Sequence, residues 1–271
     1  MMACDVGVGS KKNVFHLGLS GSSSRRTGVG RVSPPLRRTG FLLALLACLT
    51  APLHAQSTSV TGVVGVSSQL VDRGVAITPD TPTFQGAVSW SSPAGWSFSL
   101  SGSSELRSPG RVVEATAEAS RYWSLSADWQ MQASLLYYSY PSTPSSRVYD
   151  RAETSVDWIY RDVLTFGVSA IHVFGGREHQ PRGAADVDLH WPLPWNFSLS
   201  TGAGIAQSLV APNSLYNYDK ASFYRYGHTG MTWETGPWRV ELDRILVERG
   251  ARRYWGNLSA SPWVATISRS F

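Results

Sequence analysis

The stretch that decides the fold runs from Leu70 to Trp90 and reads Leu-Val-Asp-Arg-Gly-Val-Ala-Ile-Thr-Pro-Asp-Thr-Pro-Thr-Phe-Gln-Gly-Ala-Val-Ser-Trp. It contains the end of one predicted strand, a long loop with two prolines, and a second predicted strand that ends at a tryptophan. A short turn follows at Ser91–Gly95. The same order of strand, longer loop, strand and short turn recurs along the rest of the chain.

Alternating side chains predict strands throughout the chain after Ala55. From Trp195 to Ile205, the residues Trp, Phe, Leu, Thr, Ala and Ile alternate with Asn, Ser, Ser, Gly and Gly. The segments 96–101, 113–120 and 125–137 alternate in the same way. Because successive side chains of a strand point to opposite faces, each segment has one apolar and one polar face. Alternation alone fits a soluble sandwich or a membrane barrel.

Tryptophan marks one end of the predicted strands. Short turns are expected at Ser91–Gly95, Ser124–Leu125, Arg161–Asp162, Pro192–Pro194 and Thr235–Gly236. Nine of the eleven tryptophans flank these turns: Trp90, Trp96, Trp123, Trp129, Trp158, Trp191, Trp195, Trp233 and Trp238. Short turns ringed by aromatic residues and alternating with longer loops are typical of a membrane barrel with an interfacial girdle.

The predicted fold is therefore all-β, a closed antiparallel transmembrane β-barrel of about twelve strands with short periplasmic turns and longer outer loops. The strands are expected at residues 58–70, 83–91, 95–105, 112–123, 126–139, 152–161, 163–174, 184–191, 195–207, 221–233, 238–247 and 258–271. An even number places both chain ends on one side, and most of these strands can cross a bilayer at a tilt. Pro262 requires an edge, bulge or strand-start position.

Residues 1–55 predict an N-terminal extension with a secretory signal peptide, and residues 56–271 form the barrel domain. Arg37 and Arg38 precede the apolar run Phe41–Leu49, which is too short to cross a bilayer as a helix. We expect cleavage after the small residue Ala55. Lipidation at Cys48 is the alternative to this cleavage. For the segment before residue 37, we favour a start codon assigned too far upstream over a mitochondrial-type transit peptide.

Charge and cysteine content exclude several classes of protein. Residues 1–55 hold seven of the 24 Lys and Arg and one of the 19 Asp and Glu, which leaves 17 basic and 18 acidic residues in the barrel domain. This balance gives no electrostatic basis for nucleic-acid binding. Both cysteines, Cys4 and Cys48, precede residue 56. The barrel domain therefore has no disulfide or thiolate metal site, and we expect neither a cofactor nor a metal.

The opening stretch resembles the TorF family of porins, which are outer-membrane proteins of proteobacteria. The resemblance is carried by Ser68, Arg73, Gly74, Thr78, Pro82, Gln85 and Gly86. The family usually has an aromatic residue two positions after the serine, where this chain has Leu70. The terminal Phe271 resembles the signal that outer-membrane barrels present to their assembly machinery. The resemblance implies a pore-type barrel in the outer membrane of a Gram-negative bacterium, without a defined substrate or catalytic residues.

Two interpretations apply to Arg73 and Gly74. The arginine folds into the mouth of the barrel as a functional group, or Gly74 supplies a positive φ in the loop while Arg73 pairs with a carboxylate of the lumen. We favour the second interpretation. Gln85 and Gly86 are expected to be strand-pairing or bulge positions rather than ligand contacts.

The polar face opposite the tryptophans should line the lumen. It carries Glu114, Glu118, Asp128, Glu153, Asp157, Asp186, Asp188, Glu241 and Asp243, against Arg239 and Arg269. Rings of carboxylates favour cations, so we hypothesise an acidic lumen with a mild preference for cations. The alternative is a plugged lumen whose charges pair internally, because twelve strands lie between filled and open barrels in size.

The sequence thus predicts a porin-like barrel for passive diffusion of small solutes, with the lipid bilayer and the barrel-assembly machinery as further partners. A non-conducting barrel with a binding or structural role is the second hypothesis. The third is an outer-membrane enzyme acting on lipid or peptide, because His190 and Asp188 share a face that Ser198 or Ser200 could approach. Serine is also a common lumen filler, so we expect no enzymatic activity.

Overall fold

The computed structural model describes residues 58–142, 149–174, 181–209, 223–249 and 259–271. The predicted extension and signal peptide lie outside these residues, as do the greater parts of several predicted outer loops. In the described part of the chain, no helix is long and apolar enough to cross a membrane.

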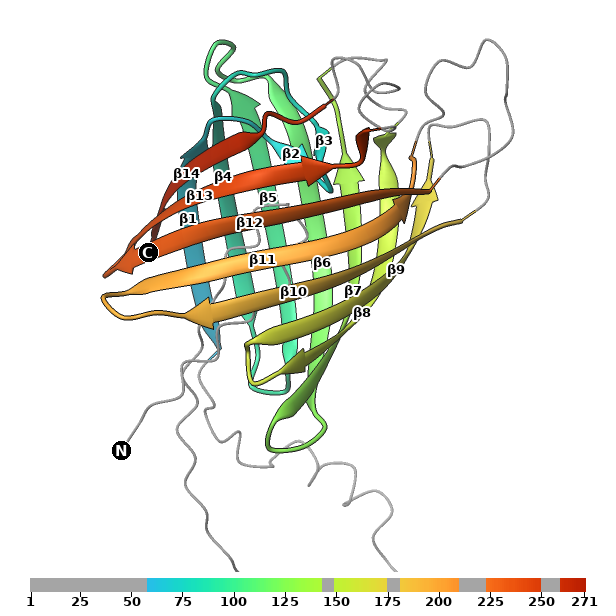
Figure 1. The fold of residues 1–271 in the computed structure, drawn as a ribbon, viewed down its shortest axis with the longest axis vertical. Helices are drawn as coiled ribbons and strands as arrows, with labels where there is room; N and C mark the ends of the chain where they lie inside the picture. Colours follow the sequence, from blue (N-terminus) through green and yellow to red (C-terminus); the bar gives the residue numbers. More distant parts are fainter. Residues whose placement is uncertain (1–57, 143–148, 175–180, 210–222, 250–258) are drawn as a thin grey trace, which may run out of the picture.

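Twelve antiparallel strands form one closed barrel, as the sequence predicted (Figure 1). They are β1 (Ser59–Ser67), β4 (Thr83–Ser91), β5 (Trp96–Glu105), β6 (Val112–Ser124), β7 (Trp129–Ser139), β8 (Arg151–Tyr160), β9 (Leu164–Val173), β10 (Arg182–Pro192), β11 (Phe197–Gln207), β12 (Phe223–Thr235), β13 (Trp238–Val247) and β14 (Trp263–Ser270). Each strand of the barrel pairs with its neighbours along the chain, and β1 pairs with β14 to close the sheet.

Two further strands, β2 (Val71–Asp72) and β3 (Val75–Ala76), form a separate two-stranded sheet that the sequence did not predict. They lie between β1 and β4 in the chain. Figure 1 shows them inside the barrel, near one of its ends.

Differences at the strand ends follow from local chemistry. Strand β7 starts at Trp129, three residues later than predicted, because the Ser126 hydroxyl accepts hydrogen bonds from the backbone N–H groups of Asp128 and Trp129 and keeps the chain in a turn. Strand β14 starts at Trp263, directly after Pro262. Pro262 thus has the strand-start position that its missing N–H requires.

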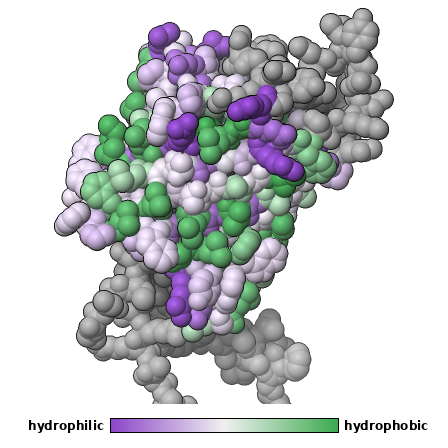
Figure 2. All heavy atoms as spheres, in the orientation of Figure 1, coloured by the Kyte–Doolittle hydropathy of each residue, from purple (hydrophilic) through white to green (hydrophobic). Residues whose placement is uncertain are grey.

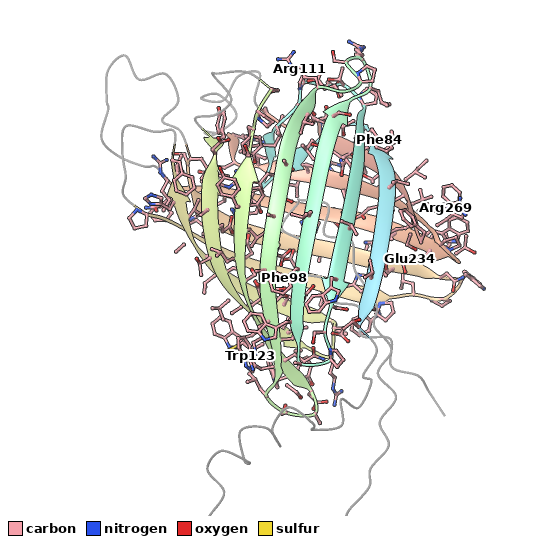
Figure 3. All side chains as sticks on the ribbon, turned by 180° about the vertical axis from the view of Figure 1, so that it is seen from behind. Phe84, Phe98, Arg111, Trp123, Glu234 and Arg269 are labelled. Carbon is pink, nitrogen blue, oxygen red and sulfur yellow. The ribbon has the colours of Figure 1, made fainter. Side chains whose placement is uncertain are left out.

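The two ends of the barrel differ. At the turn end, short connections join β4 to β5, β6 to β7, β8 to β9, β10 to β11 and β12 to β13, and residues 58 and 271 also lie there. Eight of the nine predicted girdle tryptophans lie on the outer face of strands near this end. Trp195, 85% exposed, lies instead in the turn between β10 and β11, where Trp195 and Asn196 have positive φ, so this turn comes later than the predicted Pro192–Pro194. The opposite, loop end has an outer aromatic set that the sequence analysis missed: Phe84, Tyr137, Phe174, Phe223 and Trp263. In Figure 3, Trp123 marks the turn end and Arg111 the loop end.

The outer face between these aromatic sets is apolar. Val60, Leu100 and Leu135 are 67%, 60% and 54% exposed, and hydrophobic side chains cover much of the middle of the wall in Figure 2. The inner positions of the same strands hold mostly Ser, Thr, Gln and charged residues. This arrangement is the inverse of a soluble protein and suits a wall surrounded by lipid.

The prediction that Arg269 lines the lumen is wrong. Arg269 lies on the outer face, where its guanidinium carbon is 5.5 Å from the centre of the Trp238 ring. In β14, Arg269 shares its side of the strand with Ile267, which is 52% exposed. The alternation of β14 therefore points Arg269 outward.

The last residue takes part in closing the sheet. The backbone N–H of Phe271 donates to the carbonyl of Gly62, and the N–H of Gly62 donates to the carbonyl of Phe271, both at 2.9 Å. Residues Val63–Ser67 then continue the pairing with residues 266–270. Phe271 is therefore the final rung of the seam between β1 and β14.

Deleting Phe271 should lower the free energy of unfolding by about 1–3 kcal/mol, because two backbone hydrogen bonds are each worth roughly 0.5–1.5 kcal/mol net. Urea unfolding of the refolded protein in detergent micelles measures this change. Phe271→Leu keeps both backbone bonds and should retain most of the stability. Equal losses in the two variants would show that the ring, and not the backbone pairing, stabilises the seam.

Candidate functional site

The loop between β1 and β4 does not extend away from the barrel but folds into it. We call residues 68–82, which contain β2 and β3, the inward hairpin. Its base is held by Gln69 and Thr78: the Gln69 amide nitrogen donates to the Thr78 carbonyl at 3.1 Å, and the Leu70 N–H donates to the Thr78 hydroxyl at 3.0 Å. The Gln69 side-chain oxygen accepts from the N–H of Ser261 at 2.8 Å. The hairpin is thus tied to the segment that precedes β14.

Arg73 and Gly74 form the tip of the inward hairpin. Both have positive φ, +47° and +79°, which is the pattern of the tight two-residue turn that best matches the twist of paired strands. A Cβ on residue 74 would also meet the side chain of Val247 at 2.5 Å. Gly74 therefore has the positive φ that the sequence predicted, and it lies against β13.

Two ion pairs join the tip to β8, and we call them the hairpin clamp. Arg73 donates through both terminal nitrogens to Glu153, at 3.1 and 2.5 Å, and also to the Ser169 hydroxyl at 3.2 Å. Arg151 donates to Asp72 at 2.5 Å. All four charged side chains are at most 6% exposed. Asp72 and Arg73 are thus adjacent and oppositely charged, and each forms an ion pair with an inner residue of β8.

Aromatic side chains surround the clamp arginine of β8. The guanidinium carbon of Arg151 lies 3.9 Å from the centre of the Tyr138 ring, and one of its nitrogens donates to the Tyr140 hydroxyl at 2.9 Å. Cation–π attraction and a hydrogen bond help to offset the cost of burying this charge. Asp72, Arg151, Tyr138 and Tyr140 were not among the predicted site residues. Arg151 could have been found, because it precedes Glu153 by two residues and so shares its side of the strand.

Apolar residues anchor the inward hairpin on three sides of the barrel. Val71 packs with Ile245 and Val264 of β13 and β14. Val75 packs against a cluster of β9–β12 that includes Ile171 and Tyr224. Ile77 packs against Leu136, Tyr138 and Tyr140. The inward hairpin therefore crosses the lumen near the loop end, from β7–β9 to β12–β14.

The remaining residues of the family pattern build the frame of this hairpin. Ser68 accepts a hydrogen bond from the N–H of Ala265 at 3.1 Å, and the Pro82 carbonyl accepts from Leu106 at 2.9 Å. Gln85 and Gly86 are regular pairing positions of β4, so their expected pairing role holds, whereas the bulge of this region lies at Ser103 and Ser104. Gln85 is buried and donates to Thr83 at 3.3 Å.

The predicted pore-lining residues separate into two groups. Glu114 and Glu153 are buried near the inward hairpin, 4% and 0% exposed. A second group lies on inner positions between the hairpin and the turn end, and we call it the acidic wall: Glu118, Asp157, Asp186, Asp188, Glu241 and Asp243. Arg239, also predicted to line the pore, donates to Glu241 at 3.3 Å and pairs with Glu234 at 3.0 Å.

Asp128 was predicted to line the lumen, and the structure places it instead in the turn between β6 and β7. Its carboxylate accepts a hydrogen bond from Arg161 of the neighbouring turn at 2.8 Å. This hydrogen bond lowers the pKa of the Asp128 carboxyl. Asp128 lies outside the lumen for the same reason that β7 starts late. A residue in a turn does not follow the alternation of the strand.

Glycines on neighbouring strands make room for several carboxylates of the acidic wall. Asp157 is directly opposite Gly167, Asp186 opposite Gly204, Asp188 opposite Gly202, and Asp243 opposite Gly230. A Cβ at each of these glycines would collide with the facing carboxylate. Each aspartate side chain therefore lies over the facing glycine rather than pointing straight into the lumen. Any larger residue in place of that glycine would force the carboxylate to move.

The residues of the enzyme hypothesis lie on this same wall. His190 is paired with Ser200 across the β10–β11 hairpin. The Asp188 carboxylate, which would have to orient His190, lies 3.9 Å from the ring nitrogen of His228, and Tyr226 donates to Asp186. Within the described residues, no group of three or more His, Asp or Glu side chains could hold a metal ion.

Comparison with known proteins supports the barrel fold. No protein-family model matches the chain, and no curated protein matches it. A structure of the NanC porin is similar with a TM-score of 0.51 and 12% identity, over 79% of this chain and 99% of that chain. A KdgM porin gives 0.48 and 7% over 79% and 98%, and OprD of Pseudomonas aeruginosa gives 0.35 and 10% over 70% and 59%. The likeness to NanC establishes a porin-like fold.

Removing one charge of the clamp should release the inward hairpin. Arg73→Met leaves Glu153 buried without its cation, which costs about 3–5 kcal/mol for an uncompensated buried charge. Amide hydrogen exchange of residues 69–78 in micelles should then accelerate strongly.

The double variant Arg73→Met with Glu153→Gln is the matched control, since it removes both charges and should restore much of the protection. Unchanged exchange in Arg73→Met would contradict the role of the clamp.

Proposed function

We propose that this protein is an outer-membrane diffusion pore for small solutes, narrowed by the inward hairpin and selective for cations. The observation that carries the proposal is the acidic wall inside a closed barrel whose outer face is apolar. An apolar exterior supports a location in a bilayer, and an inner wall rich in carboxylates favours cations over anions. The porin fold of NanC supports the proposal by analogy of fold alone.

The same proposal includes the TorF resemblance, the outer-membrane localisation, the export and assembly signals and the tryptophan girdle. The TorF resemblance gains a physical basis, because Ser68, Arg73, Gly74 and Thr78 are residues that build, frame or clamp the inward hairpin. Localisation in a Gram-negative outer membrane, export through the signal in residues 1–55, and recognition of Phe271 by the assembly machinery would follow. The nine tryptophans at the turn end would then be the periplasmic girdle.

A non-conducting barrel is the second candidate, and the hairpin favours it. Contacts on three sides of the lumen could leave too little space for a solute near the loop end. The enzyme hypothesis is weaker, since Asp188, the carboxylate it assigns to His190, lies near His228. Loss of a lipid or peptide hydrolysis in His190→Ala would be needed to support it.

Single-channel recording in a planar bilayer tests the pore. In a salt gradient, the wild-type protein should show discrete steps and a reversal potential displaced towards that of the cation. The triple variant Asp157→Asn, Asp186→Asn and Asp188→Asn neutralises half of the acidic wall. It should move the reversal potential towards zero, because fixed charges that attract cations are removed.

Asp128→Asn is the matched control, because it removes one carboxylate from the turn end without changing the wall. It should leave the reversal potential unchanged. A wild-type protein that conducts anions better than cations would refute the proposed selectivity, and a folded barrel without any conductance would favour the second candidate.

A further inference from the structure

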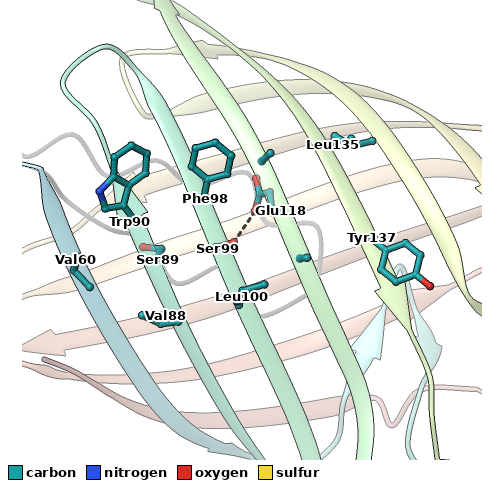
Figure 4. Close-up of a pocket in the computed structure, with 12 residues that line it drawn as sticks. Val60, Val88, Ser89, Trp90, Phe98, Ser99, Leu100, Glu118, Leu135 and Tyr137 are labelled. Carbon is teal, nitrogen blue, oxygen red and sulfur yellow. Dashed lines mark hydrogen bonds between the residues drawn. The ribbon is translucent and has the colours of Figure 1, made fainter.

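The outer face carries an apolar groove across β1 and β4–β7, and we call it the outer groove (Figure 4). Its volume is about 540 Å³. Ala117 and Ala119 of β6 lie between two pairs of larger residues, Phe98 and Leu100 of β5 and Leu135 and Tyr137 of β7. Beyond β5 the lining continues to Val88 and Trp90 of β4 and Val60 of β1. Sites for small organic ligands usually measure roughly 300–1,000 Å³, so the groove is large enough for part of a ligand.

The groove exists because β6 presents small side chains between large ones. Ala119 is paired with Phe98 on one neighbour and with Leu135 on the other. Ala117 is likewise paired with Leu100 and Tyr137. A methyl group between two much larger side chains leaves a trough along the strand. The apolar walls of the trough would lie in the hydrocarbon region of a bilayer.

The positively charged side chain of Arg121 lies at the turn end of the outer groove. Arg121 is the next outward residue of β6 after Ala119, and its guanidinium carbon lies 5.2 Å from the Trp96 ring centre and 5.1 Å from that of Trp123. Its Nε is buried and has no hydrogen-bond partner among the described residues. The ion pairs found in the described part of the chain do not include Arg121. Two indole rings therefore flank the charge, and no carboxylate of the described residues forms an ion pair with it.

We propose that the outer groove and Arg121 form a binding site for one phospholipid molecule, with an acyl chain along the alanines and the phosphate on Arg121. An apolar trough that ends at a cation is complementary to a hydrocarbon chain that ends at an anion. Arginine binds phosphate oxygens with two parallel N–H groups, and tryptophan is the usual residue at the membrane interface.

The dimensions of the groove fit one leaflet. From Ala117, where the groove begins on β6, to Arg121 the strand rises about 13 Å, at roughly 3.3 Å per residue. Half of the hydrocarbon core of a bilayer is about 15 Å thick, and a tilted strand crosses that depth over a somewhat longer path. The site would therefore reach from the headgroups at the turn end into the hydrocarbon of one leaflet. It rests on the proposed membrane location and does not require that the barrel conducts.

The test is native mass spectrometry of the purified protein in detergent, titrated with phosphatidylglycerol. The wild-type protein should retain one lipid per chain. Arg121→Ala should weaken this binding at least about tenfold, which corresponds to about 1.4 kcal/mol. Filling the groove with Ala117→Leu and Ala119→Leu should weaken it similarly by excluding the acyl chain. The two variants change different ends of the site, so each tests the proposal independently if the other fails to fold.

Matched controls come from the same outer face. Arg269→Ala removes an arginine that lies over Trp238 at the turn end but four strands away from β6. Ala203→Leu adds the bulk of one such substitution to the outer face of β11. Both should bind the lipid as the wild type does. Heat-dependent migration on gels confirms that each variant is a folded barrel.

Equal binding by the wild type, Arg121→Ala and the filled variant would overturn the proposal. It would also be overturned if the wild type were an oligomer without bound lipid that the same substitutions dissociate, since the groove would then be an interface between copies of the chain.

Discussion

Two buried ion pairs, Asp72 with Arg151 and Arg73 with Glu153, determine where the inward hairpin lies in the lumen. A charge inside a protein is tolerated only with a partner close by, so each pair holds the inward hairpin against β8 in one position. The bidentate contact of Arg73 adds directional hydrogen bonds to the attraction. The hairpin divides the interior into a packed region near the loop end and the acidic wall towards the turn end.

The wall of the barrel meets opposite chemical requirements on its inner and outer faces. Outside, aliphatic residues between two aromatic sets suit a hydrocarbon environment. Inside, carboxylates lie beside glycines on the neighbouring strands, as Asp188 does beside Gly202. The same strand can meet both requirements because its side chains alternate. Strand β6 shows this directly, since Glu118 faces the lumen while Ala117 and Ala119 lie in the outer groove.

The regular part of the fold could be predicted from the sequence, because alternation and turn residues are local signals. Strands β4 and β13 have the predicted limits. The turn between β10 and β11 lies later than predicted, at Trp195 and Asn196, so only the structure decides that Ser200 and not Ser198 is opposite His190. The inward hairpin could not be predicted in the same way. Its strands have two residues each, and its clamp partners are 79 and 80 residues away in the chain. The sequence indicated a carboxylate partner for Arg73 but not which one.

The most direct test of the account is the conductance of a variant whose hairpin is removed. The pairing of β1 with β4 continues to Ser67 and Thr83, so a short Gly and Ser linker in place of residues 69–81 can join the two strands without disturbing the barrel. If the inward hairpin narrows the pore, single-channel conductance should rise several-fold above that of the wild type. An unchanged conductance in a correctly folded variant would contradict the central claim.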